Sequence, residues 1–154
     1  MNRASIFSDN NYELSYRIRW SNDKYVEHRN DIVECLKSND SDVQFIILSA
    51  LFKIGPIAHD LIPMVKPHVY SDDINLSQLA LQVLGNIGSK NPDEIVDVVN
   101  ASLDCDHLQE TALRTAAFFG EKMLCLKGNI QAIAVGSKMK IRKLAIKATS
   151  KMLC

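Results

Sequence analysis

The feature that most constrains the fold is a sequence repeat with a period of about 33 residues. Four similar stretches occur, DVQFIILSALFKIG at 42–55, NLSQLALQVLGNIG at 75–88, HLQETALRTAAFFG at 107–120 and the more degenerate KIRKLAIKATSKML at 140–153. Because apolar residues recur at intervals of three and four in each copy, each is predicted to be an α-helix rather than a buried strand. In the first copy, Asp42 is the predicted N-cap and Gly55-Pro56 the stop.

Aligning the four copies gives columns of apolar residues that are expected to form the core. The columns are Val43, Leu76, Leu108 and Ile141; Ile47, Ala80, Ala112 and Ala145; Leu48, Leu81, Leu113 and Ile146; and Ile54, Ile87, Phe119 and Met152. Alanine occupies one column three times, which indicates a place where helices pack closely.

A second amphipathic helix is predicted before each copy, at 31–38, 60–69, 94–103 and 129–135. Asn91, Pro92 and Glu94 form a good helix start, with Asn91 as the N-cap. The helix pairs then fill four repeats, at about 24–55, 56–88, 89–120 and 121–154. A chain of such pairs is predicted to be an all-α, right-handed α-solenoid, because no single pair buries its apolar faces alone.

Residues 1–23 do not fit the repeat and are predicted to form an N-terminal capping segment over the first repeat. Within 9–23 the stretch YELSYRIRW alternates apolar and polar residues, as a strand does. The same stretch also contains apolar pairs four residues apart, as a helix does. A capping helix is the prediction, and an extended arm is the alternative.

The pattern resembles the HEAT repeat. DLIPMVKPHVYSDDINLSQLALQVLGNIG is similar to that family's first helix with its central proline (Pro63), a turn containing Asp, and a second helix that ends in Leu-Gly-x-Ile-Gly. The resemblance implies that the second helices line the concave face of the solenoid. It departs from the family at the position that usually holds an Arg for a ladder between repeats, which here holds Gln44, Ser77, Gln109 and Arg142.

Charge is distributed unevenly although Lys+Arg and Asp+Glu balance at 18 each. Residues 30–121 contain 14 acidic and five basic side chains, and residues 122–154 contain eight basic and no acidic ones. The acidic residues fall at helix starts and in turns, which favours a capping role. The alternative is an acidic surface that attracts a basic partner.

Two surface sets are candidate binding residues. Phe45 and Phe118 occupy columns that are otherwise polar, so they are expected to face solvent and to contribute to an interaction hot spot. The predicted partner-binding set on the second helices is Phe45, Phe118, Gln78, Gln82, Glu110 and Arg114. The predicted basic patch on the last helix is Lys140, Lys143, Lys147 and Lys151, which could contact phosphates without reading sequence.

No catalytic, metal-ligating or cofactor-binding set is expected. The four histidines are spread among different repeat positions, with no nucleophile or acid paired to them. The cysteines Cys35, Cys105, Cys125 and Cys154 form no metal spacing and are expected to be buried or partly buried thiols. No stretch of signal-peptide or membrane-span length is evident, so a cytoplasmic protein without a membrane partner is expected.

The sequence therefore predicts a non-catalytic protein–protein interaction module that binds another protein on the second-helix face, and the acidic middle of the chain favours a basic partner. A scaffold, an adaptor and a stoichiometric inhibitor all fit, and an immunity-type inhibitor of a basic toxin is one version. The first alternative is nucleic-acid backbone binding through the basic last helix. The second is an enzyme of the HEAT-like kind. The sequence indicates no oligomeric state.

Overall fold

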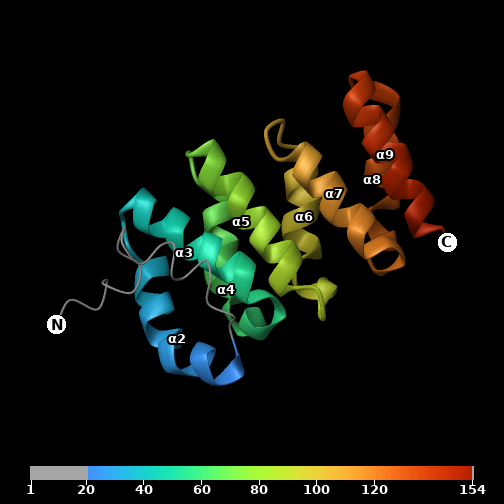
Figure 1. The fold of residues 1–154 in the computed structure, drawn as a ribbon. Coiled ribbons are helices and arrows are strands. Elements are labelled where there is room, and N and C mark those ends of the chain that lie inside the picture. Colours follow the sequence, from blue (N-terminus) through green and yellow to red (C-terminus); the bar gives the residue numbers. More distant parts are fainter. Residues whose placement is uncertain (1–20, 154) are drawn as a thin grey trace. The chain divides into compact units, whose positions relative to one another are not determined.

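The computed structural model describes residues 21–153, and every regular element in that range is helical, with no strand (Figure 1). The all-α class predicted from the sequence is therefore confirmed. The chain divides into two compact units, Met1–Ile87 and Gly88–Cys154, and the boundary falls one residue before the predicted limit between the second and third repeats. Each unit is described by itself, and the predicted conformations of 9–20 lie outside the described residues.

In its described part, residues 21–87, the first unit contains four α-helical segments in chain order. They are α2 (Asn22–Leu36), α3 (Ser41–Ile54), α4 (Ile62–Val65) and α5 (Ile74–Ile87), with the 3-10 helices η2 (Gly55–Leu61) and η3 (Lys66–Tyr70) on either side of α4. Helix α3 packs against both α2 and α5 and supplies fully buried side chains to the core of the unit, Ile47, Leu48 and Leu51. The predicted helix at 60–69 is mostly 3-10 because Pro63 and Pro67 have no amide hydrogen to donate.

The second unit repeats this plan. Its elements are η4 (Pro92–Glu94), α6 (Val96–Leu103), α7 (Gln109–Phe119), η5 (Gly120–Leu126), α8 (Lys127–Gly136) and α9 (Met139–Met152). Helix α8 (10 residues) is longer than its counterpart α4 (4 residues). Helix α9 packs against α7, α8 and η5. The four predicted second helices are thus present as α3, α5, α7 and α9, although α7 begins at Gln109 rather than at 107.

The helix starts differ from the predicted ones. Asp40 caps α3, since its Oδ1 accepts the backbone N–H groups of Asp42 (2.9 Å) and Val43 (3.4 Å); the predicted cap, Asp42, lies in the first turn. Asn91 makes no capping bond to the backbone and instead donates from Nδ2 to Glu94 Oε1 at 3.3 Å. Helix α2 begins at Asn22, so residues assigned to the capping segment, 22–23, belong to the first helix.

The predicted core columns are buried with one clear exception. The column of Ile47 and its three alanine counterparts is fully buried, and so is most of the Ile54 column. Ile146 was expected in the core but is 57% exposed. Its counterparts are covered, whereas no described helix packs over this face of α9. Val43 and Ile141 are half-buried, because they lie in or next to the first turn of their helices.

The column that departs from the HEAT pattern has a defined structural role. In all four repeats, its polar side chain donates a hydrogen bond to a backbone carbonyl at or just beyond the end of the preceding helix. The bonds are Gln44 Nε2 to Ser38 O (2.5 Å), Ser77 Oγ to Val69 O (2.6 Å), Gln109 Nε2 to Leu103 O (2.9 Å) and Arg142 Nη2 to Val135 O (3.4 Å). Since the last carbonyls of a helix have no partner within it, these bonds satisfy them and connect the two helices of each pair.

The two units also share a longer repeat. The 3-10 helix η2 begins at Gly55 and η5 begins at Gly120, 65 residues later, and both are seven residues long. The same spacing separates the starts of α4 and α8 and the starts of α5 and α9. Both 3-10 helices contain a buried residue with non-helical backbone angles at the fourth position, Ala58 and Met123. A pair of helix pairs is therefore the larger structural period.

One helical run in the described range, Ser41–Tyr70, is long and apolar enough to cross a membrane by length and composition alone. The sequence was expected to contain no such stretch. Gly55 breaks this run with a φ of 69°, and α3 alone rises only about 21 Å, short of the ~30 Å hydrocarbon core. Half of the most apolar 18-residue segment of this run is buried inside the protein, as in a core helix.

Gly120 provides a test of the tight connection after α7. Its φ is 55°, and a Cβ built there would lie 2.9 Å from the Lys151 carbonyl oxygen. We expect Gly120→Ala to lower the free energy of unfolding by roughly 2 kcal/mol, because both the backbone angle and the contact are unfavourable. Chemical denaturation followed by circular dichroism measures the change.

Gly128→Ala is the matched control for this substitution. Gly128 lies within α8, and a Cβ there has no neighbour within 4 Å. Gly128→Ala should raise the free energy of unfolding by about 0.5–1 kcal/mol, since Ala is the better helix former. Equal effects of the two substitutions on stability would contradict the constraint inferred at Gly120.

Candidate functional site

The predicted partner-binding residues divide between the two units. Phe45, Gln78 and Gln82 lie on α3 and α5 of the first unit. Glu110, Arg114 and Phe118 lie on α7 of the second. The expectation that the two phenylalanines face solvent is confirmed, since Phe45 is 41% and Phe118 70% exposed. Their role in binding stays a prediction.

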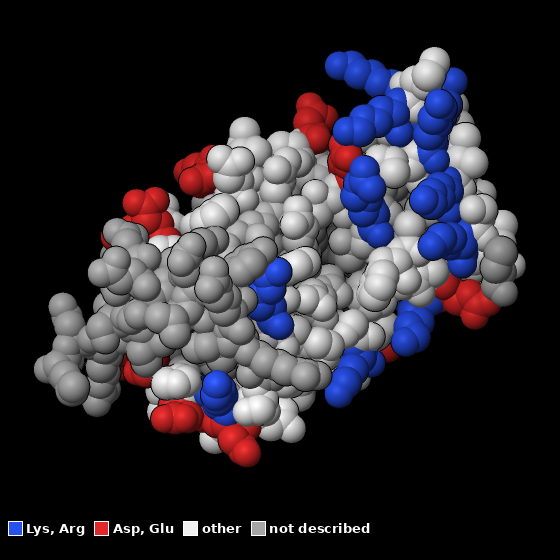
Figure 2. All heavy atoms as spheres, viewed as in Figure 1, with Lys and Arg blue, Asp and Glu red and all other residues white. Residues whose placement is uncertain are grey.

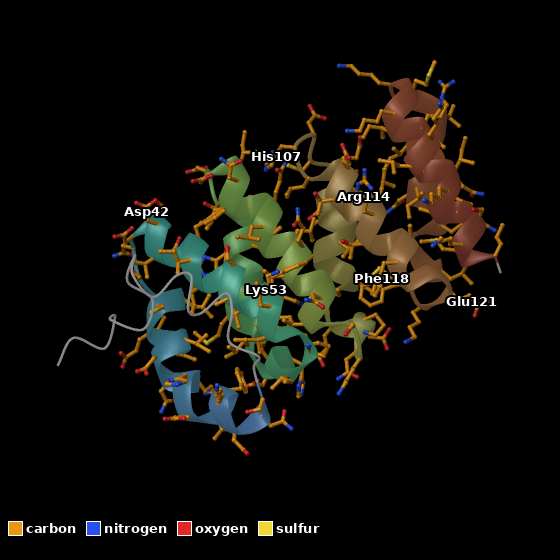
Figure 3. The ribbon with its side chains drawn as sticks, viewed as in Figure 1. Asp42, Lys53, His107, Arg114, Phe118 and Glu121 are labelled. Atoms are coloured by element: carbon orange, nitrogen blue, oxygen red, sulfur yellow. The ribbon has the colours of Figure 1, made fainter. Side chains whose placement is uncertain are left out.

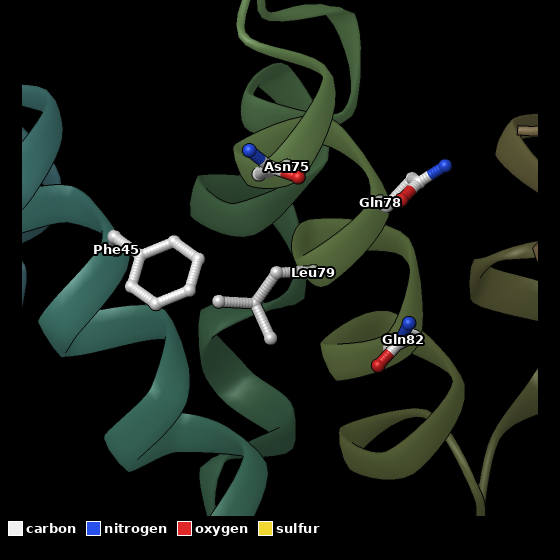
Figure 4. A pocket seen from close by; sticks show the side chains of 5 residues that line it. All are labelled: Phe45, Asn75, Gln78, Leu79 and Gln82. Carbon is white, nitrogen blue, oxygen red and sulfur yellow. The ribbon is translucent and has the colours of Figure 1, made fainter. Parts of the chain in front are cut away.

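In the first unit, Phe45 borders a shallow groove of about 310 Å³ (Figure 4). The groove is lined by Phe45, Asn75, Gln78, Leu79 and Gln82. Leu79 points toward the ring of Phe45, whereas the two glutamines project from the other side of α5. The groove is therefore apolar beside α3 and lined with amides along α5.

Leu79 was not among the predicted site residues. It is half-buried, so it fits neither the buried core columns nor the polar surface columns that the sequence predicts. The available signal was its place in the repeat, where two of its three counterparts, Ile46 and Leu144, are also apolar and the third is Thr111. A mostly apolar column beside the Phe45 column predicts an apolar strip rather than a single exposed ring.

Carboxylates gather at the end of α3 and α5 that carries Phe45 and Asn75. They are Asp40, Asp42, Asp72 and Asp73, and the turn before α3 also holds Lys37. Figure 2 shows acidic side chains at this end of the two helices. Asp40 and Asp73 cap α3 and α5 through Oδ1, so both the capping role and the acidic surface expected from the sequence are present in the same residues.

In the second unit, Glu110 connects the two predicted sets. Its Oε1 accepts from Arg114 Nη2 at 2.9 Å, and its Oε2 lies 2.7 Å from Lys140 Nζ, so the pair ties α7 to the start of α9. The hydrogen bond from Lys140 and then that from Arg114 lower the pKa of the Glu110 carboxyl. The sequence placed Lys140 in a separate patch, because residues 30 positions apart give no local signal of contact.

The remaining members of the basic patch, Lys143, Lys147 and Lys151, form a row along α9 with four-residue spacing. All three are exposed, and within residues 21–153 none of them forms an ion pair. Figure 2 shows basic side chains gathered over α9 and the neighbouring part of α7.

Phe118 belongs to the same surface. It projects from α7 one helical turn after Arg114 (Figure 3), and Gly120, two residues later, lies directly against the backbone of Lys151. Its ring meets that of the buried Phe119 edge to face, with centroids 5.2 Å apart and an interplanar angle of 78°. Helix α9 itself contains no aromatic residue, and the fold brings Phe118 to it from the preceding repeat.

No group of three or more metal-ligating side chains occurs among the described residues. One pairing contradicts the expectation that no nucleophile lies beside a histidine, since Cys105 Sγ is 3.2 Å from His107 Nδ1 in the loop between α6 and α7. Cys35 and Cys105 are half-buried as expected, and burial raises the pKa of the Cys35 thiol. Cys125 is exposed, contrary to prediction, and Cys154 lies outside the described residues.

A polar cluster inside the first unit joins α2 to η2. Asp60 accepts from Tyr25 Oη at 2.5 Å through Oδ1 and from Arg29 Nε at 2.6 Å through Oδ2. Burial alone would raise the pKa of Asp60, but these hydrogen bonds and the Arg29 charge outweigh it and lower the pKa. Burial, followed by the bond to Asp60, raises the pKa of the Tyr25 phenol. The cluster stabilises the packing of α2.

Compared with protein-family models, with characterised proteins and with solved structures, the chain has no match. The HEAT resemblance therefore rests on the repeat residues themselves.

The Asp60 cluster predicts a pH dependence of stability. Because the pKa of Asp60 is lower in the folded protein, its contribution is present above the unfolded pKa of about 4 and is lost as the pH falls through the folded pKa. We expect Asp60→Asn to lower the free energy of unfolding by about 1 kcal/mol at neutral pH, since the cluster is partly exposed. The difference from wild type should shrink below about pH 4.

Urea denaturation across this pH range measures the effect, with Asp72→Asn as the control because Asp72 is exposed in a turn of the same unit. A difference between wild type and Asp60→Asn that stays constant down to about pH 3 would contradict the cluster's role.

Proposed function

We propose that the protein is a non-catalytic protein-binding module whose partner occupies the groove beside Phe45. The groove is the observation that carries the proposal, because it combines an exposed aromatic ring with an apolar neighbour and a border of amides. Exposed aromatic residues in such settings are the usual centres of interaction hot spots.

The charge around the groove specifies the partner further. The four carboxylates at the ends of α3 and α5 favour a partner segment that carries Lys or Arg next to an apolar side chain. The apolar side chain would pack between Phe45 and Leu79, and the amides of Gln78 and Gln82 would bond polar groups of the partner backbone. Scaffold, adaptor and stoichiometric inhibitor, including an inhibitor of a basic toxin, all require this same surface.

For the architecture, we propose that the helix pairs stack in the manner of HEAT repeats. Three features support this: the 33-residue sequence period, the fully buried alanine column and the 65-residue repeat of the helix starts. In such a stack the second helices would share one face, and the groove would lie on it.

Phe45→Asp tests the function, because it places a charge where the apolar side chain of the partner would pack. A partner captured with the wild-type chain and then purified should bind this variant at least about 30-fold more weakly in calorimetric titration. Phe118→Asp makes the same chemical change in the other unit and should leave that affinity unchanged.

Circular dichroism spectra of both variants should match wild type, since both rings are exposed. If folded Phe45→Asp retains wild-type affinity for every captured partner, the groove is not the binding site.

A further inference from the structure

The face formed by α7 and α9 in the second unit has a chemistry that the groove does not share. It presents five cations, Arg114, Lys140, Lys143, Lys147 and Lys151. The one acid on α7 and α9, Glu110, is already paired with Arg114 and Lys140, and Glu121 lies just beyond the end of α7, in η5. The lysine row on α9 therefore keeps its full charge for an outside ligand, and that ligand is an anion.

The geometry of the row favours an extended anion over a single phosphate. Residues four apart on a helix are about 6 Å apart along its axis, so the row spans roughly 12 Å. Arg142, the arginine of α9, is not part of the row and donates to the Val135 carbonyl, and the three lysines act as separate point charges. Such a row suits an extended polyanion better than a single phosphate group.

Phe118 adds a second kind of contact to this face. The ring is 70% exposed, and the edge-to-face contact with Phe119 leaves at least one of its faces open. It lies at the Lys151 end of the row, because Gly120 packs against the Lys151 backbone. A flat ring beside a line of cations is the combination with which proteins bind unpaired bases and their phosphates.

We propose that this face binds single-stranded nucleic acid, with phosphates along Lys143, Lys147 and Lys151 and a base stacked on Phe118. A duplex would meet the lysines but would offer no free base to the ring. An acidic protein segment would also meet the lysines, but it would gain little from an isolated ring surrounded by cations. The proposal is independent of the Phe45 groove.

Fluorescence anisotropy with the full chain and a labelled oligothymidylate of about 20 nucleotides tests this. Phe118→Leu, which keeps an apolar contact with Phe119 but removes the ring, should weaken binding about tenfold. Lys147→Glu should weaken binding and make its salt dependence less steep. For wild type, contacts from the three lysines predict a slope of log K against log salt of about −2.

Matched controls lie in the first unit. Phe52→Leu changes another exposed phenylalanine, and Lys37→Glu reverses another exposed lysine. Both should bind the oligonucleotide as wild type does, and so should Phe45→Asp, which separates this proposal from the protein-binding one.

Three results would overturn the proposal. The first is no binding at about 50 mM salt. The second is equal affinity for a duplex of the same length. The third is equal affinity for a polyglutamate chain together with no effect of Phe118→Leu, which would make the face a site for acidic proteins.

Discussion

The structure depends on how the C-terminal end of the first helix in each helix pair is capped. The last carbonyls of a helix find no partner within it, and leaving them buried and unbonded is costly. Here a side chain from the following helix supplies the bond in every repeat, through Gln44, Ser77, Gln109 or Arg142. The HEAT family usually uses this column for a ladder between repeats. In this chain it joins the two helices of one pair, so the angle within each pair is fixed locally.

A second constraint sets how the pairs follow one another. After α3 and after α7 the chain turns sharply, with positive φ at Gly55 and Gly120. In each case the glycine faces the end of the next second helix. A Cβ at Gly120 would lie 2.9 Å from the Lys151 carbonyl oxygen, whereas a Cβ at Gly55 would make only an ordinary contact, at 3.8 Å, with the Asn86 side chain. In the first unit Asn86 also donates from Nδ2 to the Phe52 carbonyl at 2.5 Å. Gly88 occupies the same place after α5 but does not have a positive φ, and the boundary between the units falls there.

Most features that depend on residues close together in the sequence were predictable, whereas contacts between residues far apart in the sequence were not. The second helices and the buried alanine column were predictable, because burial repeats with the helical period. The cap at Asp40 was missed by two residues, since Asp occurs at both 40 and 42 and only the backbone angles distinguish them. Ile146 was misplaced because a sequence column cannot show which helix lacks a neighbour. At the surface, exposure of Phe45 was predictable, whereas the Glu110–Lys140 pair needed the packing of α9 on α7.

Between positions 65 residues apart, the buried side chains keep their character, whereas the surface side chains change. On α5 one row of positions holds the amides Gln78, Gln82 and Asn86, of which Gln82 is exposed and the other two are half-buried. The equivalent positions on α9 hold the exposed Lys143, Lys147 and Lys151. On α3 and α7, Phe45 is replaced by Glu110, and Lys53 by Phe118. The glycines and most buried positions of the plan stay glycine or apolar. One backbone plan thus carries a neutral, aromatic groove in one unit and a cationic face in the other. Since exposed substitutions change stability little, the two surfaces were free to differ without changing the core on which both depend.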